Sequence, residues 1–120
     1  MQIMDLLADL PTNLPQELFE TLLQTETLRI ERIVSRGHVS PPNDWYDQDE
    51  HEWVLLLSGA ARIEIEDSPE LIELRPGQAL LLPARQRHRV AWTDPDQASV
   101  WLAIFFQSPA AASQSPQINH

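Results

Sequence analysis

Residues 51–66 read HEWVLLLSGAARIEIE and residues 76–88 read PGQALLLPARQRH, and these two stretches decide the fold. The apolar run 53–57 stops at Ser58 and Gly59, a pattern that predicts a strand buried on both faces. Residues 61–66 then alternate apolar and charged side chains, which predicts a strand with one face in water. The period of two in this second stretch indicates β-structure rather than helix.

Further extended segments lie on both sides of these stretches. Apolar patterning predicts strands over residues 28–35, 71–74, 79–82, 86–93 and 99–106, separated by turns rich in proline, glycine and aspartate. Short strands of this number and spacing indicate an antiparallel sandwich or barrel, because closure removes the exposed edges of a sheet. We therefore predict an all-β fold.

The first 26 residues follow a different pattern. Pro15 stands where a helix could begin, and Leu18, Phe19, Leu22 and Leu23 fall on one apolar helical stripe. We therefore predict a short N-terminal helix that packs on the barrel. The expected organisation is a helical segment over 1–26, a single barrel domain over 27–107 and a disordered tail over 108–120.

Composition limits the partners of the chain. Its 120 residues carry a net charge of −10, all eight basic residues are arginines and cysteine is absent. A chain this acidic repels polyanions, so we expect no nucleic-acid binding. The N-terminus lacks the basic residues of a signal peptide, and no apolar run approaches the ~20 residues of a membrane span. The lack of cysteine fits a reducing compartment, so we expect a cytoplasmic protein that does not enter membranes.

One quoted stretch resembles the second of the two motifs that define the cupin family. That motif runs Gly, five residues, Pro, one residue, Gly, two residues, His, three residues, Asn. Gly77, Pro83 and His88 fall at the matching spacings. Arg85 replaces the middle glycine and Trp92 replaces the final asparagine.

The other quoted stretch resembles the first cupin motif, which ends in Glu, six residues, Gly. Glu52 and Gly59 match that ending. The two motifs occur in the family's order and together cover residues 37–93. The resemblance implies an antiparallel cupin β-barrel of the jelly-roll type, with Glu52 and His88 on its inner face. It also implies a homodimer, and we expect residues 28–34 and 99–106 to contribute to its interface.

The resemblance further implies a metal site, for which cupins usually place His-x-His three or four residues before the motif's glutamate. Here the two registers offer Trp45 with Asp47, or Tyr46 with Gln48, so neither supplies histidine. His51 neighbours Glu52 and is expected on the opposite face of the strand. The remaining candidate ligands are Asp47, Gln48, Glu52 and His88. This oxygen-rich set favours Mn²⁺, Fe²⁺ or Mg²⁺, with Zn²⁺ a further candidate. The alternative is that Glu52 and His88 hydrogen-bond each other and hold no metal.

The barrel interior is the expected site for an unidentified small molecule. Candidates to line it are Trp45, Tyr46, Gln86 and Trp92, whereas Trp53 and Trp101 lie in apolar strands and are expected in the core. Three functions stay open: metal-assisted catalysis, metal-free ligand binding or sensing, and protein interaction by a barrel filled with side chains. The sequence does not decide whether the chain is an enzyme.

Overall fold

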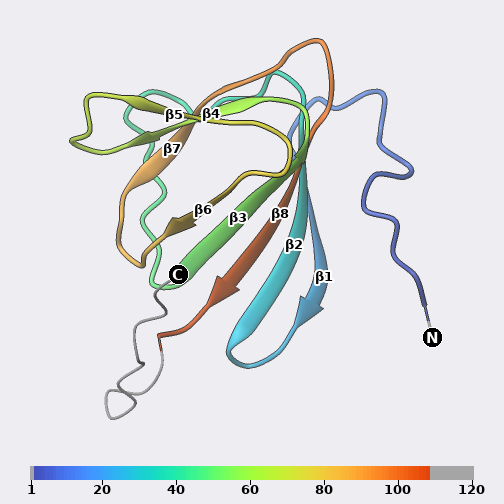
Figure 1. The fold of residues 1–120 in the computed structure, drawn as a ribbon, viewed down its shortest axis with the longest axis horizontal. Helices are drawn as coiled ribbons and strands as arrows, with labels where there is room; N and C mark the ends of the chain where they lie inside the picture. The colour runs from blue at the N-terminus through green and yellow to red at the C-terminus, as the bar shows by residue number, and fades with distance from the viewer. Residues whose placement is uncertain (1, 109–120) are drawn as a thin grey trace.

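The computed structural model describes residues 2–108, which contain eight β-strands and no helix. The strands are β1 (Leu18–Gln24), β2 (Leu28–Ser35), β3 (His51–Ser58), β4 (Ala61–Ile65), β5 (Leu71–Leu74), β6 (Ala79–Leu82), β7 (His88–Thr93) and β8 (Ser99–Phe106). They form a five-stranded sheet in the order β1-β2-β8-β3-β6 and a three-stranded sheet in the order β5-β4-β7 (Figure 1). Every pairing is antiparallel, so the prediction of an all-β antiparallel fold is confirmed.

The predicted N-terminal helix is wrong. Residues 18–24 form strand β1, which pairs with β2 so that Leu18 lies opposite Val34 and Phe19 opposite Ile33. The apolar residues that suggest a helical stripe are also compatible with a strand, in which Leu18 and Phe19 point to opposite faces. A β-bulge between Thr21 and Leu23 then brings Leu23 onto the face of Leu18. Without β1, strand β2 would leave a row of backbone groups unpaired, and this hairpin pairing overrides the helical pattern.

Strands β2 to β8 lie where the period-two pattern predicts them, with one difference in burial. Strand β3 has one buried face, formed by Glu52, Val54 and Leu56, while Trp53 and Leu55 on the other face are half-buried. The prediction that this strand is buried on both faces is therefore wrong, because the second sheet packs against only one side of it. The predicted tail falls outside the described residues except for Ser108.

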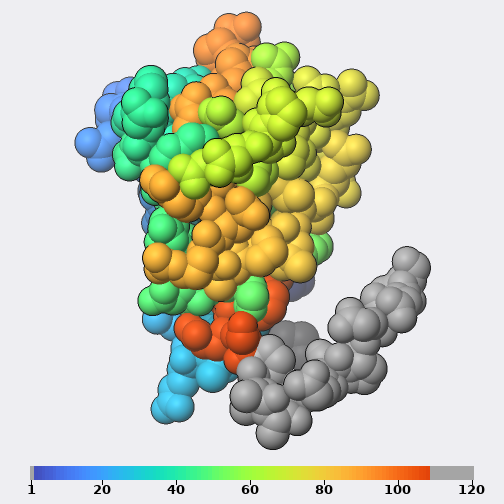
Figure 2. Space-filling view, turned by 90° about the vertical axis from the view of Figure 1, so that its left-hand side faces the viewer, coloured from blue at the N-terminus to red at the C-terminus, as the bar shows by residue number. Residues whose placement is uncertain are grey.

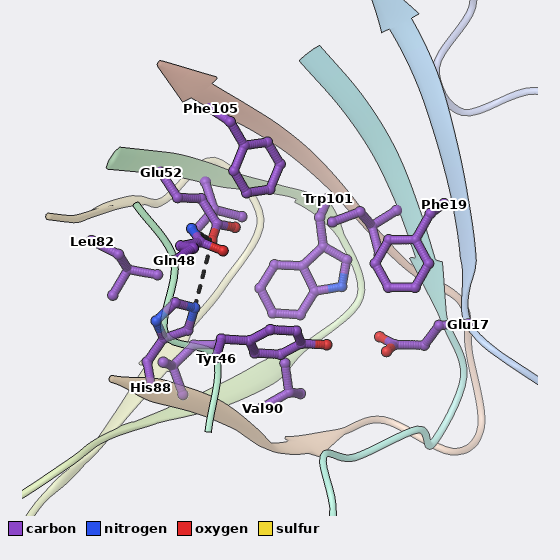
Figure 3. Close-up of a pocket in the computed structure, with 13 residues that line it drawn as sticks. Glu17, Phe19, Tyr46, Gln48, Glu52, Leu82, His88, Val90, Trp101 and Phe105 are labelled. Atoms are coloured by element: carbon purple, nitrogen blue, oxygen red, sulfur yellow. Dashed lines mark hydrogen bonds and ion pairs between the residues drawn. The ribbon is translucent and has the colours of Figure 1, made fainter. Parts of the chain in front are cut away.

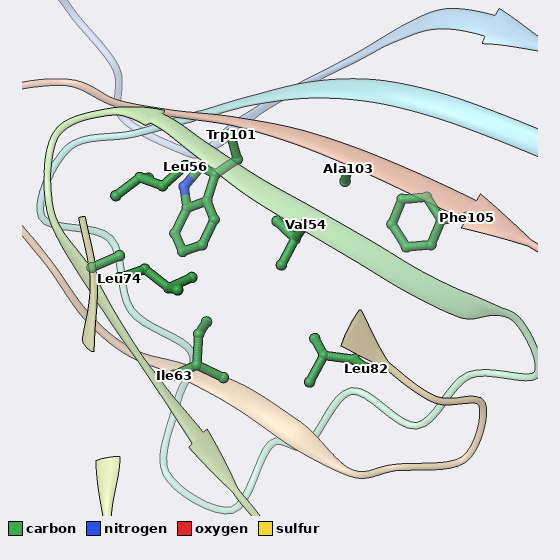
Figure 4. Close-up of a cluster of buried hydrophobic side chains, with 9 residues drawn as sticks. Val54, Leu56, Ile63, Leu74, Leu82, Trp101, Ala103 and Phe105 are labelled. Carbon is green, nitrogen blue, oxygen red and sulfur yellow. The ribbon is translucent and has the colours of Figure 1, made fainter. Parts of the chain in front are cut away.

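The hydrophobic core fills the space between the two sheets (Figure 4). Alternate side chains of β3 and β8 point inward from the large sheet, as the period of two requires. They meet residues of the small sheet, and each fully buried aliphatic side chain contributes about 1.5–3 kcal/mol. The buried cluster is Val54, Leu56, Ala61, Ile63, Leu74, Leu82, Trp101, Ala103 and Phe105.

The turn between β3 and β4 carries the chain from one sheet to the other. Gly59 lies in this turn at φ +91°, and its Cα faces the backbone of Ser99. The Ser99 hydroxyl accepts a hydrogen bond from the Ala60 amide at 3.2 Å and donates one to the Ala60 carbonyl at 3.1 Å. The start of β8 is thereby fixed to the turn.

The structure over residues 2–108 contains no helix of the length and apolarity needed to cross a membrane.

The loop between β2 and β3 runs beside β7 as an irregular extra strand. The Ser40 amide donates to the Val90 carbonyl at 2.9 Å, and the Tyr46 amide donates to the His88 carbonyl at 2.7 Å. In the space-filling view this green-teal loop lies alongside the orange segment that leads into β7 (Figure 2). The loop therefore closes one side of the barrel and brings Tyr46 next to His88.

Candidate functional site

Glu52 and His88 meet inside the barrel from opposite sheets. Glu52 lies on β3 opposite Leu82 of β6, and His88 is the first residue of β7. Their side chains are 11% and 5% exposed, and His88 Nε2 lies 3.5 Å from Glu52 Oε1. The two residues thus face each other, as the spacing of the two motifs predicts.

Three neighbours fix the geometry of this pair. His88 Nδ1 lies 3.0 Å from the Gln86 carbonyl, which can only accept, so Nδ1 carries the proton and Nε2 faces Glu52. The Gln48 amide donates to Glu52 Oε1 at 3.1 Å. The Tyr46 ring stacks on the imidazole with centroids 5.5 Å apart. Both imidazole nitrogens and Glu52 Oε1 therefore have defined partners.

The surroundings change the proton affinity of two groups. Burial alone would lower the pKa of His88. The Glu52 carboxylate and the Gln86 carbonyl outweigh this effect, so the pKa lies above its ordinary value. Burial raises the pKa of the Tyr46 hydroxyl, and the carboxylates of Glu17, Glu52 and Asp44 raise it further. The site therefore favours a protonated imidazole beside Glu52 and a neutral tyrosine.

A cavity opens next to this pair (Figure 3). The cavity has a volume of about 70 Å³, which suits a ligand of roughly five to ten non-hydrogen atoms. Its polar residues are Glu17, Tyr46, Gln48, Glu52 and His88. Its apolar wall consists of Phe19, Ile33, Val54, Ile63, Leu82, Val90, Trp101 and Phe105. A largely apolar hollow with a few converging polar groups is the usual form of a small-molecule site.

Glu17 is a residue of this cavity that sequence reasoning missed. The Trp101 indole N–H donates to Ser35 Oγ at 3.3 Å, and the Ser35 hydroxyl donates to Glu17 Oε2 at 2.5 Å. These two hydrogen bonds hold the carboxylate at the cavity wall. The pairing of Leu18 with Val34 brings Glu17 level with Ser35, so only the strand register of β1 could have indicated this position.

The predicted site residues divide into two groups. Tyr46, Gln48, Glu52 and His88 all line the cavity. Asp47 instead forms an ion pair with Arg85 at 3.1 Å, and neither Trp45 nor Trp92 is among the cavity-lining residues. Trp92 lies 4.7 Å from the Arg62 guanidinium, and Gln86 reaches the site only through its backbone carbonyl.

Two further sequence expectations concern residues beside the pair. Trp101 is 3% exposed, as expected of a core residue, yet its ring also lines the cavity. His51 accepts a hydrogen bond from the Ala84 amide at 2.9 Å through Nδ1 and is not a lining residue. Arg85, which replaces the middle glycine of the motif, has a left-handed backbone with φ +68°, a conformation that glycine adopts more readily than arginine.

The donor set does not fit a resident divalent metal. Among residues 2–108, no group of three or more His, Cys, Asp or Glu side chains is arranged to hold one. Glu52 and His88 offer one carboxylate and one imidazole, whereas catalytic metal sites use about three protein ligands. Gln48 directs its amide N–H at Glu52, and Asp47 is engaged by Arg85.

Comparisons with known proteins agree with the barrel described above. The family model described as Cupin domain matches residues 32–105. The crystal structure of a "putative mannose-6-phosphate isomerase" from Ralstonia eutropha is 45% identical, with a TM-score of 0.87, and the match covers 90% of this chain and 100% of that one. A conserved protein of unknown function from Streptococcus pyogenes is 24% identical, with a TM-score of 0.71, over 91% of this chain and 90% of that one.

A third solved structure shows the same fold. A cupin superfamily protein from Desulfitobacterium hafniense is 21% identical, with a TM-score of 0.68, over 82% of this chain and 84% of that one. At 24% and 21% identity, the Streptococcus and Desulfitobacterium structures support the fold alone. Comparison with curated proteins gave no match.

Proposed function

Because this chain belongs to the cupin family, whose barrel it forms with a cavity inside, we propose that it binds a small organic molecule next to Glu52 and His88. The observation that carries the proposal is the convergence of Glu52, Gln48 and His88 on one end of a mainly apolar cavity. The apolar wall would supply affinity, and the polar end would fix the ligand's orientation. This is metal-free ligand binding.

A sugar phosphate is a poor candidate for that ligand, although the Ralstonia protein carries the name of a sugar-phosphate isomerase. Phosphate sites use arginine, lysine or the backbone amides at the start of a helix. The cavity wall contains two glutamates and neither arginine nor lysine, and residues 2–108 contain no helix. A phosphate dianion would be repelled, so we propose a ligand without phosphate.

Soaking crystals in 2-propanol tests the proposed site, because this molecule combines two methyl groups with one hydroxyl. We expect it to occupy the cavity with its hydroxyl within hydrogen-bonding distance of Glu52 or Gln48. The variant Val90→Phe, which extends a larger side chain into the cavity, should exclude the molecule from this position but not from the surface. Occupation of surface sites alone in the wild type would refute the proposal.

Metal analysis tests the metal-free part of the proposal. Protein purified without a metal-binding tag and then dialysed against Mn²⁺ or Zn²⁺ should retain less than about 0.1 equivalent after desalting, because two side-chain ligands hold divalent ions weakly. Elemental analysis by mass spectrometry measures the content. One tightly held equivalent that disappears in His88→Ala would place a metal at the pair and overturn this part.

A further inference from the structure

The charges around the cavity are all of one sign apart from His88. The cavity wall contains Glu17 and Glu52, and none of the chain's arginines lines it. His88 faces Glu52 at 3.5 Å and can balance that carboxylate. None of the ion pairs among residues 2–108 involves Glu17. One carboxylate at the cavity wall therefore lacks a countercharge from the described residues.

Aromatic rings surround this carboxylate. Phe19, Tyr46 and Trp101 line the part of the cavity that contains Glu17, and the Tyr46 hydroxyl points toward it (Figure 3). The negative face of an aromatic ring attracts a cation, most strongly where water is excluded. A carboxylate among three such rings is the arrangement that binds alkylated ammonium groups.

The position of Glu17 is built into the fold rather than left to a mobile side chain. The hydrogen bonds from Trp101 to Ser35 and from Ser35 to Glu17 hold the carboxylate in place, and Ser35 is completely buried. Glu17 is also among the carboxylates that raise the pKa of Tyr46, which indicates a negative potential in this part of the cavity. An uncharged or anionic ligand would leave that potential unbalanced.

We infer that the cavity selects a small organic cation, with an alkylated ammonium group held by Glu17, Phe19 and Trp101 and a polar group held at Glu52 and Gln48. The inference rests on the proposed function and narrows its ligand class. Within the cavity, Figure 3 shows Glu17 and Glu52 on either side of the Trp101 ring. A cation with a short hydroxyl-bearing arm has a charged end for Glu17 and a polar end for Glu52 and Gln48.

Titration calorimetry with a matched pair of ligands tests the inference. Choline carries a trimethylammonium group and a hydroxyl, and 3,3-dimethylbutan-1-ol replaces its nitrogen by carbon without other change. We expect choline to bind at least about tenfold more tightly than the neutral alcohol, because only choline offsets Glu17 and interacts with the rings electrostatically. Mannose 6-phosphate, the anionic probe, should give no heat of binding.

Three variants test whether Glu17 and Phe19 cause the preference for choline over the neutral alcohol. Glu17→Gln keeps a side chain that can accept from Ser35 and should reduce the preference for choline to less than about threefold. Glu26→Gln changes the net charge equally at an exposed position away from the cavity and should preserve the preference. Phe19→Ala removes a ring that is 52% exposed, so the fold should persist while choline binds at least about threefold more weakly.

The outcomes separate this inference from the proposed function. Equal affinity for choline and the alcohol, or a preference that survives Glu17→Gln, would overturn cation selection and leave the cavity as a small-molecule site. Failure of choline to bind at all would also overturn it. The proposed function is tested separately, and it fails if 2-propanol is absent from the cavity.

Discussion

Replacing Gly59 with alanine is expected to leave little folded protein at room temperature. A Cβ atom at this position would lie 2.4 Å from Ser99 Oγ, 2.5 Å from Ser99 Cα and 2.8 Å from the Ala98 carbonyl oxygen. Two of these are backbone atoms, which cannot move without separating β8 from the turn. The φ of +91° adds strain for any residue with a side chain. We expect a loss of about 5 kcal/mol or more, which equals the whole stability of a marginally stable domain.

Gly77→Ala provides the matched control for this substitution. Gly77 has nearly the same backbone angle, φ +90°, but a Cβ atom there would meet nothing within 4 Å beyond its own chain neighbours. The cost should therefore be only the conformational strain, about 1–2 kcal/mol. Urea denaturation followed by tryptophan fluorescence measures both variants. Similar losses at the two glycines would show that backbone strain, not the clash with Ser99, dominates at Gly59.

His88→Ala is expected to destabilise the protein by about 1–3 kcal/mol, because Glu52 would stay buried without its imidazole partner. The loss should depend on pH. Since the pKa of His88 is raised in the folded state, protonation stabilises the fold. This contribution is complete below about pH 6.5 and is lost as the pH rises through the folded-state pKa. The difference in stability between wild type and variant should therefore be larger at about pH 6 than at about pH 8.5.

Glu52→Gln gives the control for the pH effect. The glutamine keeps the size of the side chain but removes the charge that favours protonation of His88. Adding His88→Ala in this background should produce a loss with much less dependence on pH. Urea titrations of the four proteins at both pH values complete the double-mutant cycle. A pH dependence of equal size in both backgrounds would assign it to an interaction other than the pair.

The sequence predicts the barrel well because the residues of most strands show an apolar pattern that indicates a strand without reference to distant parts of the chain. The alternation over residues 61–66 and the Gly59 stop are local features, and the structure places β3 and β4 on either side of that turn. The short helix predicted within the first 26 residues fails for the opposite reason. Residues 18–24 fit both periods, and pairing with a strand that begins only four residues later decides between them.

The site is predicted only in part, for a related reason. Motif spacing brings Glu52 and His88 together because both lie on regular strands whose faces follow from their positions. Asp47 and Gln48 lie in an irregular loop, where alternation does not tell which side chain points inward. The structure shows Gln48 at the cavity and Asp47 at Arg85. Glu17 could not be predicted at all, since its place depends on the register of β1.

The position of β1 has a consequence for how ligand choice can diverge among related barrels. Glu17 and Phe19 lie outside residues 32–105, which the Cupin domain model matches, whereas Glu52 and His88 lie within them. Among the strands of residues 2–108, β1 lies at the edge of its sheet and pairs only with β2. A recombination that exchanges this terminal strand would alter one wall of the cavity and leave the central pair untouched. Ligand preference can thus evolve separately from the rest of the barrel, because exchanging β1 changes only its pairing with β2.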